Sequence, residues 1–184
     1  MSLPVAQLHS RAESLAAKFK QGDGSSYIDE AIVLDRKALE LCPPGHPKRH
    51  VPLSSLGRHL GERYEQLGAM TDLNEAIFLD RDALALRPPG HPDRPDSLNR
   101  LAIHLSTRYK QLGEMEDLNE AILLARDALA LCPPGNPGRS VSLQNLANRL
   151  STRYKQFGAM EDLNEAIALD RDRSEERRVG KECW

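Results

Sequence analysis

The chain has 184 residues, enough for a domain with a sizeable buried core. Its 25 Lys and Arg residues nearly balance its 27 Asp and Glu residues. This balance argues against a nucleic-acid or anionic-membrane surface, which needs a basic excess on one face. No apolar run approaches the roughly 18–20 residues of a membrane span, and the N-terminus lacks the pattern of a secretory signal. Three cysteines are too few for a disulfide framework, so we expect a reducing, cytoplasmic environment.

Two independent sequence landmarks recur with one period. The string DLNEAI begins at Asp72, Asp117 and Asp162, each 45 residues after the last, and a weaker copy begins at Tyr27. The string PPG recurs with the same spacing, at Pro43, Pro88 and Pro133. Internal repetition of this kind decides the architecture of a chain before local structure is considered.

The repeat divides residues 6–172 into units 6–50, 51–95, 96–140 and a truncated unit, 141–172. Residues 96–127 and 141–172 are identical at 23 of 32 positions, which indicates duplication. Each unit is expected to form two helices, which we name helix A and helix B. A lone helix pair leaves much of its apolar surface in water, so the units must stack. We therefore predict an all-α fold, a right-handed α-solenoid of stacked helix-turn-helix repeats.

The third unit shows the pattern clearly. The apolar spacing of helix A predicts one buried stripe, and Gly113 is expected to end the helix in the left-handed conformation. Asp117 is predicted to be the N-cap of helix B, with Glu120 completing a capping box. Pro133 and Pro134 are expected to stop helix B. The predicted core positions are Leu98, Leu101, Ala102, Leu105 and Tyr109 of helix A, and Leu118, Ala121, Ile122, Leu124, Ala128, Leu129 and Leu131 of helix B.

Small residues lie where the helices of each unit are expected to cross closely. They are Gly57, Ala102 and Ala147 in helix A and Ala76, Ala121 and Ala166 in helix B, followed by Pro88 and Pro133. This spacing resembles the tetratricopeptide (TPR) repeat, although the period of 45 residues exceeds the usual ~34. The chain is similar to long-unit TPRs such as those of kinesin light chains. It resembles still more closely the arrays of basidiomycete fungal proteins that often precede a caspase-like CHAT domain.

The C-terminal tail breaks the repeat in the middle of a helix. After Asp172 the repeat requires Ala-Leu, but the chain gives RSEERRVGKECW. The string RSEERRVGKEC matches the translation of a common sequencing-library adapter, so residues 173–184 are expected not to be native. The alternative is a divergent terminal cap, because terminal repeats are often atypical. On the adapter interpretation, the chain is a fragment of a longer protein.

The sequence offers few residues for chemistry. Cys42 and His46 could suggest a thiol nucleophile, but no other unit keeps the pair. His59 and His104 share a repeat position, and we expect the histidines to be solvated surface residues rather than metal ligands. Carboxylate pairs such as Asp80 and Asp82 are expected on helix surfaces. We therefore predict no catalytic residue, no metal site and no cofactor.

An Arg-Tyr pair repeats at Tyr64, Tyr109 and Tyr154, each preceded by arginine. A tyrosine ladder could form a recognition stripe. We favour a packing role late in helix A, with the arginine available to a carboxylate of helix B, because structural positions stay constant between repeats.

Binding positions, in contrast, are expected to vary between repeats. Several variable positions are predicted to line the inner, concave face, where polar side chains could hold an extended peptide by its backbone or carboxylates. Drift on a solvent-exposed face would give the same variation. The candidate partner-binding residues are Arg58, Asn99, Ile103, Lys110, Gln144, Asn145, Asn148 and Lys155.

The leading hypothesis is a non-enzymatic scaffold that binds a peptide or protein partner on its concave face. The alternative is a sensor array attached to a signalling enzyme such as a CHAT protease. A third hypothesis, RNA binding by helical repeats, is disfavoured by the charge balance and would require salt-sensitive binding. We also predict self-association through the truncated end, where poorly covered side chains are expected at Leu163, Ile167 and Leu169.

Overall fold

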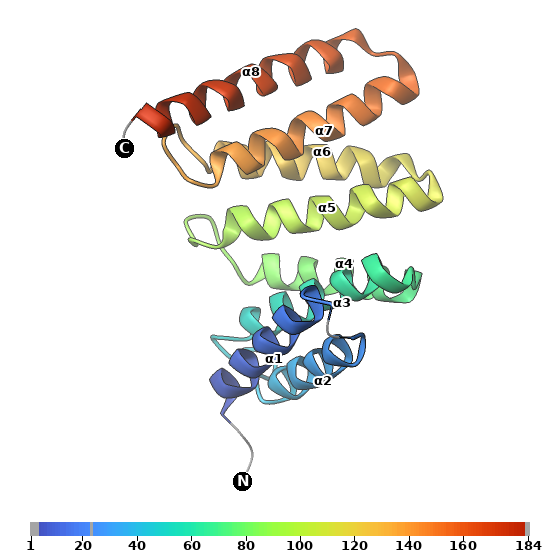
Figure 1. Cartoon of the computed structure of the whole chain (residues 1–184), viewed down its shortest axis with the longest axis vertical. Coiled ribbons are helices and arrows are strands. Elements are labelled where there is room, and N and C mark those ends of the chain that lie inside the picture. Colours follow the sequence, from blue (N-terminus) through green and yellow to red (C-terminus); the bar gives the residue numbers. More distant parts are fainter. Residues whose placement is uncertain (1–3, 23, 183–184) are drawn as a thin grey trace. The chain divides into compact units, whose positions relative to one another are not determined.

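The computed structural model describes residues 4–22 and 24–182, apart from the side chains of residues 177 and 179–182. These residues form eight α-helices and no β-strand (Figure 1). The chain divides into two compact units, Met1–His91 and Pro92–Trp184. The helices are α1 (Val5–Lys20), α2 (Ser26–Glu40), α3 (His50–Leu67) and α4 (Met70–Ala85) in the first unit, and α5 (Arg94–Leu112), α6 (Met115–Ala130), α7 (Arg139–Phe157) and α8 (Met160–Glu182) in the second.

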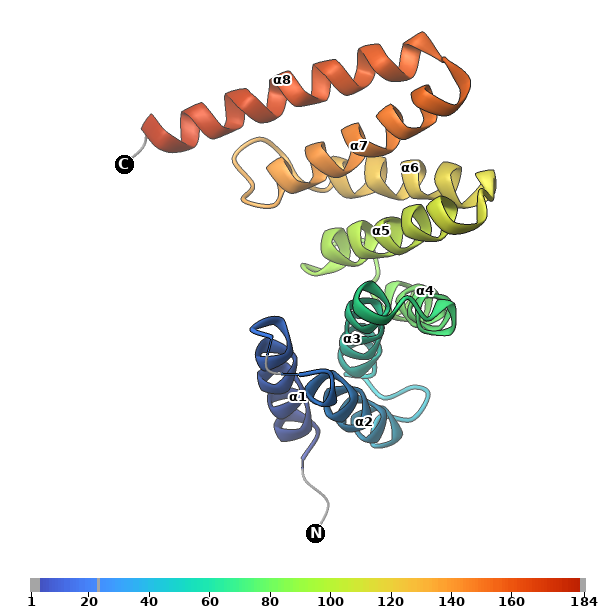
Figure 2. The ribbon, with the colours of Figure 1, turned by 45° about the vertical axis from the view of Figure 1, so that its right-hand side comes forward.

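Consecutive helices pack against one another within each unit. In the first unit α1 packs on α2, α2 on α3 and α3 on α4, and α1 also contacts α3. In the second unit α5 to α8 pack in the same order, α5 also contacts α7, and the helix pairs run antiparallel (Figure 2). The prediction of stacked helix pairs is therefore confirmed within each unit. In the described part of the chain, no helix is both long enough and apolar enough to cross a membrane.

The predicted apolar stripes form the cores. In the second unit all five predicted residues of α5 are buried, and Leu118, Ala121, Ile122 and Ala128 of α6 are buried beneath them. Leu131, which we predicted to join this core, is instead 41% exposed because it lies beyond the last residue of α6. The first unit has a matching core centred on Ile28, Leu53, Leu56 and Leu60.

Small residues sit at the close crossings, as predicted. Ala76, Ala102, Ala121, Ala147 and Ala166 are all at most 3% exposed. Gly57 of α3 shows why size matters at this position, since a Cβ atom there would lie 2.8 Å from Asp80 Oδ1 of α4. A methyl group at this distance would require the buried Asp80 side chain to shift.

The predicted end of helix A is confirmed. Gly113 follows α5 with φ 75°, and Gly68 and Gly158 follow α3 and α7 with φ 71° each. Their amide N–H groups donate to Tyr64, Tyr109 and Tyr154 carbonyl oxygens at 2.7 Å, which satisfies a carbonyl at each helix end. Helices α5 and α7 have 19 residues each, against 16 for α6, so helix A is the longer helix of the repeat in this part of the chain.

The predicted N-cap of helix B is wrong. Helix α6 begins at Met115, so Glu114 is the N-cap residue and Asp117 lies in the first turn. Asp117 is 5% exposed and accepts hydrogen bonds from Arg108 instead of capping the helix. A D-x-x-E string fits a helix that begins just after the aspartate and also a helix that begins two residues before it. In this protein the hydrogen bonds between Asp117 and Arg108 of α5 favour the second arrangement.

Arg108 and the equivalent arginines join helix A to helix B in three of the 45-residue repeats, as the sequence indicated. The guanidinium groups of Arg63, Arg108 and Arg153 each bind one carboxylate through two hydrogen bonds of 2.6–2.7 Å. The carboxylates belong to Asp72, Asp117 and Asp162. Hydrogen bonding to these aspartates raises the pKa of each arginine, although partial burial opposes the shift. Tyr64 and Tyr109 are buried beside the pairs and Tyr154 is half-buried, which agrees with a packing role.

The loops that follow helix B are held by arginine side chains. Arg49 Nη1 donates to the Cys42 carbonyl oxygen at 2.5 Å, and Arg139 Nη1 donates to that of Cys132 at 2.7 Å. Both cysteines are buried just after the end of helix B. His46 Nδ1 accepts a hydrogen bond from the Lys48 amide, so this histidine stabilises the loop.

Helix α8 is covered more completely than we predicted. Leu169 is only 9% exposed and Leu163 is half-buried, because both pack toward α7. Ile167 is 44% exposed, as expected. The helix continues through the tail to Glu182, and Arg139 Nε lies 3.1 Å from Glu176 Oε1.

Candidate functional site

A groove of about 150 Å³ lies between α5 and α7, the two A helices of the second unit. Its walls come from residues one or two helical turns apart, so their side chains share one face of each helix. The lining residues are Ile103, Ser106, Thr107 and Lys110 from α5, and Asn145, Asn148, Arg149 and Thr152 from α7. No acidic residue lines the groove.

The groove brings together four of the predicted partner-binding residues: Ile103, Lys110, Asn145 and Asn148. Ile103 is 39% exposed, so it offers an apolar contact beside polar groups. Lys110 and Asn148 are exposed. Lys155 is also exposed on α7 but does not line the groove.

Two other predicted residues are engaged inside the protein. Asn99 is 8% exposed and donates through Nδ2 to Ser142 Oγ at 3.0 Å, and its Oδ1 accepts from Asn145 Nδ2 at 3.4 Å. Gln144 donates through Nε2 to Asn148 Oδ1 at 2.9 Å. The bonds of Asn99 join α5 to α7 and hold Asn145 beside the groove, whereas the bond between Gln144 and Asn148 lies within α7. Asn99 is therefore bonded within the protein and does not line the groove.

Arg149 was not among the predicted residues, yet it is the most unusual group in the groove. The residue is 5% exposed, and its Nε donates to the Ala102 carbonyl oxygen at 3.3 Å. Its Nη1 donates to the Asn145 carbonyl oxygen. Burial lowers the pKa of Arg149 to about 10, since removal from water disfavours the charged form. A sequence signal was available, because the equivalent residues of the earlier repeats are His59 and His104.

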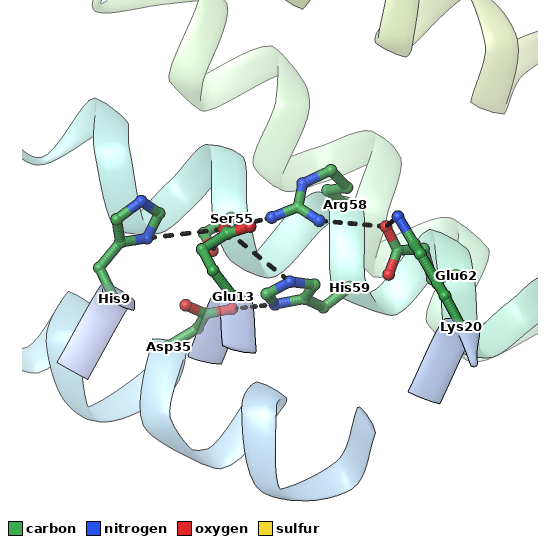
Figure 3. Close-up of polar contacts among 8 residues, drawn as sticks. All are labelled: His9, Glu13, Lys20, Asp35, Ser55, Arg58, His59 and Glu62. Carbon is green, nitrogen blue, oxygen red and sulfur yellow. Dashed lines mark hydrogen bonds and ion pairs between the residues drawn. The ribbon is translucent and has the colours of Figure 1, made fainter. Parts of the chain in front are cut away.

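The first unit carries a network of charged side chains between α1 and α3 (Figure 3). Arg58, a predicted binding residue, binds Glu13 Oε1 and also donates to Glu62 Oε1 at 3.1 Å. Lys20 Nζ lies 2.8 Å from Glu62 Oε1, and Ser55 Oγ donates to Glu13 Oε1 at 3.2 Å. The cations on this face are therefore neutralised within the protein.

Glu13 is the centre of that network. Burial alone raises the pKa of Glu13, but the nearby Arg58, His59 and His9 and the hydrogen bond from Ser55 outweigh it. The net result is a pKa below the ordinary value, so Glu13 stays ionised near neutral pH. A hollow of about 390 Å³ opens beside the network, lined in part by Phe19, Lys20 and Glu62, and its lysine is already paired with Glu62.

The prediction of solvated histidines is wrong for His59 and His104, which are 0% and 8% exposed. His59 Nδ1 lies 2.6 Å from Asp35 Oδ2 of α2, and Asp35 is also fully buried. Asp80, expected on a helix surface, is 0% exposed as well. The hydrogen bond between the two side chains lowers the cost of burying them, although Asp35 Oδ1 and His59 Nε2 have no hydrogen-bond partner in the described part of the chain. His50 and His91 are half-buried, with ring centroids 5.2 Å apart.

No protein-family model and no curated protein matches this sequence. Solved structures of helical repeat proteins do match. A de novo designed helical repeat protein, DHR64, has a TM-score of 0.51 at 18% identity, over 97% of this chain and 95% of that chain. The DHF58 filament has a TM-score of 0.55 at 17% identity, over 97% and 94%. At such identities the likeness shows the fold alone: this chain has a helical repeat fold.

A TPR-like repeat protein titled as a kinesin light chain of Podosopora anserina also matches. Its TM-score is 0.44 at 20% identity, over 92% of this chain and 97% of that chain. This TM-score is below 0.5, and the likeness of the chain to long TPR units is a resemblance in sequence.

Proposed function

We propose that this chain is a protein-interaction scaffold and that the α5–α7 groove binds an extended segment of a partner protein. The observation that supports the proposal most is the composition of the groove. It joins an exposed aliphatic side chain, Ile103, to amide, hydroxyl and cationic groups that vary between repeats. Extended peptides are recognised by such mixtures, since polar groups bind the backbone and apolar groups select side chains.

The surface between α1 and α3 is less suited to binding a partner than the α5–α7 groove. Arg58 and Lys20 are held by Glu13 and Glu62 in the first unit, so a ligand there must displace existing ion pairs. In the groove, Lys110 and Arg149 form no ion pair with any described side chain. A ligand in the groove can therefore use these donors without breaking an intramolecular pair.

The test is a selection of random 12-residue peptides on the purified chain, followed by calorimetric titration of the synthetic winners. Asn148→Trp should place an indole over the groove and lower the affinity at least roughly tenfold, about 1.4 kcal/mol. Asn164→Trp, on the exposed surface of α8, is the matched control and should change the affinity less than about twofold. Saturable peptides that bind both variants equally would place binding elsewhere, and the absence of any saturable peptide would contradict the scaffold function.

A further inference from the structure

Arg149 lacks the acidic partner that the equivalent residue has in the first unit. In the first unit this position is His59, whose Nδ1 lies 2.6 Å from Asp35 of α2. In the second unit the residue equivalent to Asp35 is Ala125 of α6, and His59 is replaced by Arg149 of α7. At this pair of repeat positions, alanine (Ala125) therefore stands in place of the acid Asp35, and arginine (Arg149) in place of the histidine His59.

Arg149 consequently carries a charge that the protein does not neutralise. Its hydrogen bonds go to the backbone carbonyl oxygens of Ala102 and Asn145, and both use Nε or Nη1. Among the side chains that the structure describes, no carboxylate forms an ion pair with it, and Nη2 makes no hydrogen bond. A cation that is 5% exposed normally has an acidic partner, because burial removes it from water.

A second group in the groove also lacks a partner. Ser106 Oγ of α5 is shielded from water and has no hydrogen-bond partner in the structure. Ser106 and Arg149 line the same groove, with exposed Lys110 one turn further along α5. Buried polar atoms are almost always satisfied, so an orphan hydroxyl beside an uncompensated guanidinium indicates a ligand that accepts hydrogen bonds and carries negative charge.

We propose that the α5–α7 groove binds the side-chain carboxylate of an aspartate or glutamate in a partner's peptide segment. Arg149 supplies the balancing charge and the Nη2 donor, Ser106 donates a hydroxyl hydrogen bond, and Lys110 attracts the anion at the rim. A cavity of about 150 Å³ accommodates one such side chain. This inference rests on the proposed function and specifies the chemistry of the partner.

The probes are two capped pentapeptides, Ac-Ala-Leu-Glu-Leu-Ala-NH₂ and its counterpart with Gln at the centre. Caps remove the terminal charges, so the two differ only in the carboxylate. Titration followed by the amide resonances of ¹⁵N-labelled chain should show saturable binding of the Glu peptide and at least roughly tenfold weaker binding of the Gln peptide. An uncapped peptide with free C-terminal carboxylate and central Gln tests the other source of a carboxylate, and it should not restore the affinity.

Ala125→Asp is the decisive variant, because it returns to α6 the acid that the repeat carries at Asp35. The new carboxylate should neutralise Arg149 from inside and weaken the Glu peptide about tenfold, with no effect on the Gln peptide. Ala125→Asn, of equal size but uncharged, should keep the affinity of the wild type. Lys110→Glu, on an exposed residue that leaves the core intact, should also weaken the Glu peptide and serves if Ala125→Asp fails to fold.

Equal affinities for the Glu and Gln peptides, or no detectable binding of either, would overturn the carboxylate site. So would a Glu-peptide affinity unchanged by both Ala125→Asp and Lys110→Glu. None of these results touches the proposed function, which is tested separately by selected peptides and the Asn148→Trp variant.

Discussion

Arg153 and Asp162 face each other across the turn between α7 and α8, joined by two hydrogen bonds of 2.7 Å: Nε to Oδ2, and Nη2 to Oδ1. The third donor, Nη1, reaches Asn119 Oδ1 of α6 at 3.2 Å. One guanidinium therefore fastens three consecutive helices, and Arg63 does the same with Asp72 and Asp29 in the first unit. This role agrees with the sequence, because the three later repeats keep both the arginine and its aspartate partner.

Arg153→Lys should destabilise the fold by about 1–3 kcal/mol, because lysine cannot form the two parallel hydrogen bonds. Urea unfolding followed by circular dichroism measures the change. Arg126→Lys is the control, since Arg126 and Glu165 are both exposed and such pairs contribute about 0–1 kcal/mol. Equal losses in the two variants would show that the Arg153 fork has no special role.

Acid should weaken the same pair. Hydrogen bonding to Arg153 holds the pKa of Asp162 below its ordinary 3.8, against the opposing effect of burial. A lowered pKa in the folded state means that the stabilisation is complete above the unfolded-state pKa and is lost as pH falls through the folded-state value. The gap in unfolding free energy between wild type and Asp162→Asn should therefore be largest near neutral pH and shrink as pH falls below the ordinary aspartate pKa of 3.8. A gap that is constant from neutral pH to pH 2 would contradict the assignment.

The buried Asp35–His59 pair should be exchangeable for the pair used in the second unit. Asp35→Ala alone should cost about 3–5 kcal/mol, because it leaves His59 buried without its hydrogen-bond partner. The double variant Asp35→Ala with His59→Arg copies Ala125 and Arg149 and should recover part of the loss, with Glu13 close enough to balance the new charge. Urea unfolding of the three proteins decides the matter. A single variant within about 0.5 kcal/mol of wild type would show that the pair is not needed.

Self-association through α8 remains a prediction. Of the three residues that we expected to be poorly covered, Leu169 is buried and Ile167 is 44% exposed, and Met160 at the start of the helix is 53% exposed. Sedimentation velocity should show a mass that rises with concentration, and Ile167→Lys should abolish the rise. A monomer whose sedimentation does not depend on concentration would contradict the prediction.

The sequence predicted the helix pairs, the glycine ends and the buried stripes because these depend on local spacing. The Glu13–Arg58 ion pair and the Asp35–His59 contact join residues that are 45 and 24 positions apart in the sequence, and no local pattern specifies them. The repeat did carry a signal that we did not use. Asp35 with His59, and Ala125 with Arg149, change together at one pair of repeat positions, which indicates a contact.

The site was predicted only in part for a related reason. Variation between repeats selected Ile103, Lys110, Asn145 and Asn148 as candidate binding residues, and the structure places these four around one groove. It could not separate Asn99, which varies because it joins an internal hydrogen-bond network, from residues that face a ligand. Variation between repeats shows that a position is not needed for the packing common to all repeats. The contacts in the structure are needed to show what the residue at that position does instead.

The most direct test of the scaffold account is to map a selected peptide on the ¹⁵N-labelled chain by amide chemical shifts. At saturation the largest shifts should fall in residues 103–110 of α5 and 145–152 of α7, and they should vanish in Asn148→Trp. Shifts confined to other helices, with α5 and α7 unchanged, would contradict the assignment of the groove as the binding surface.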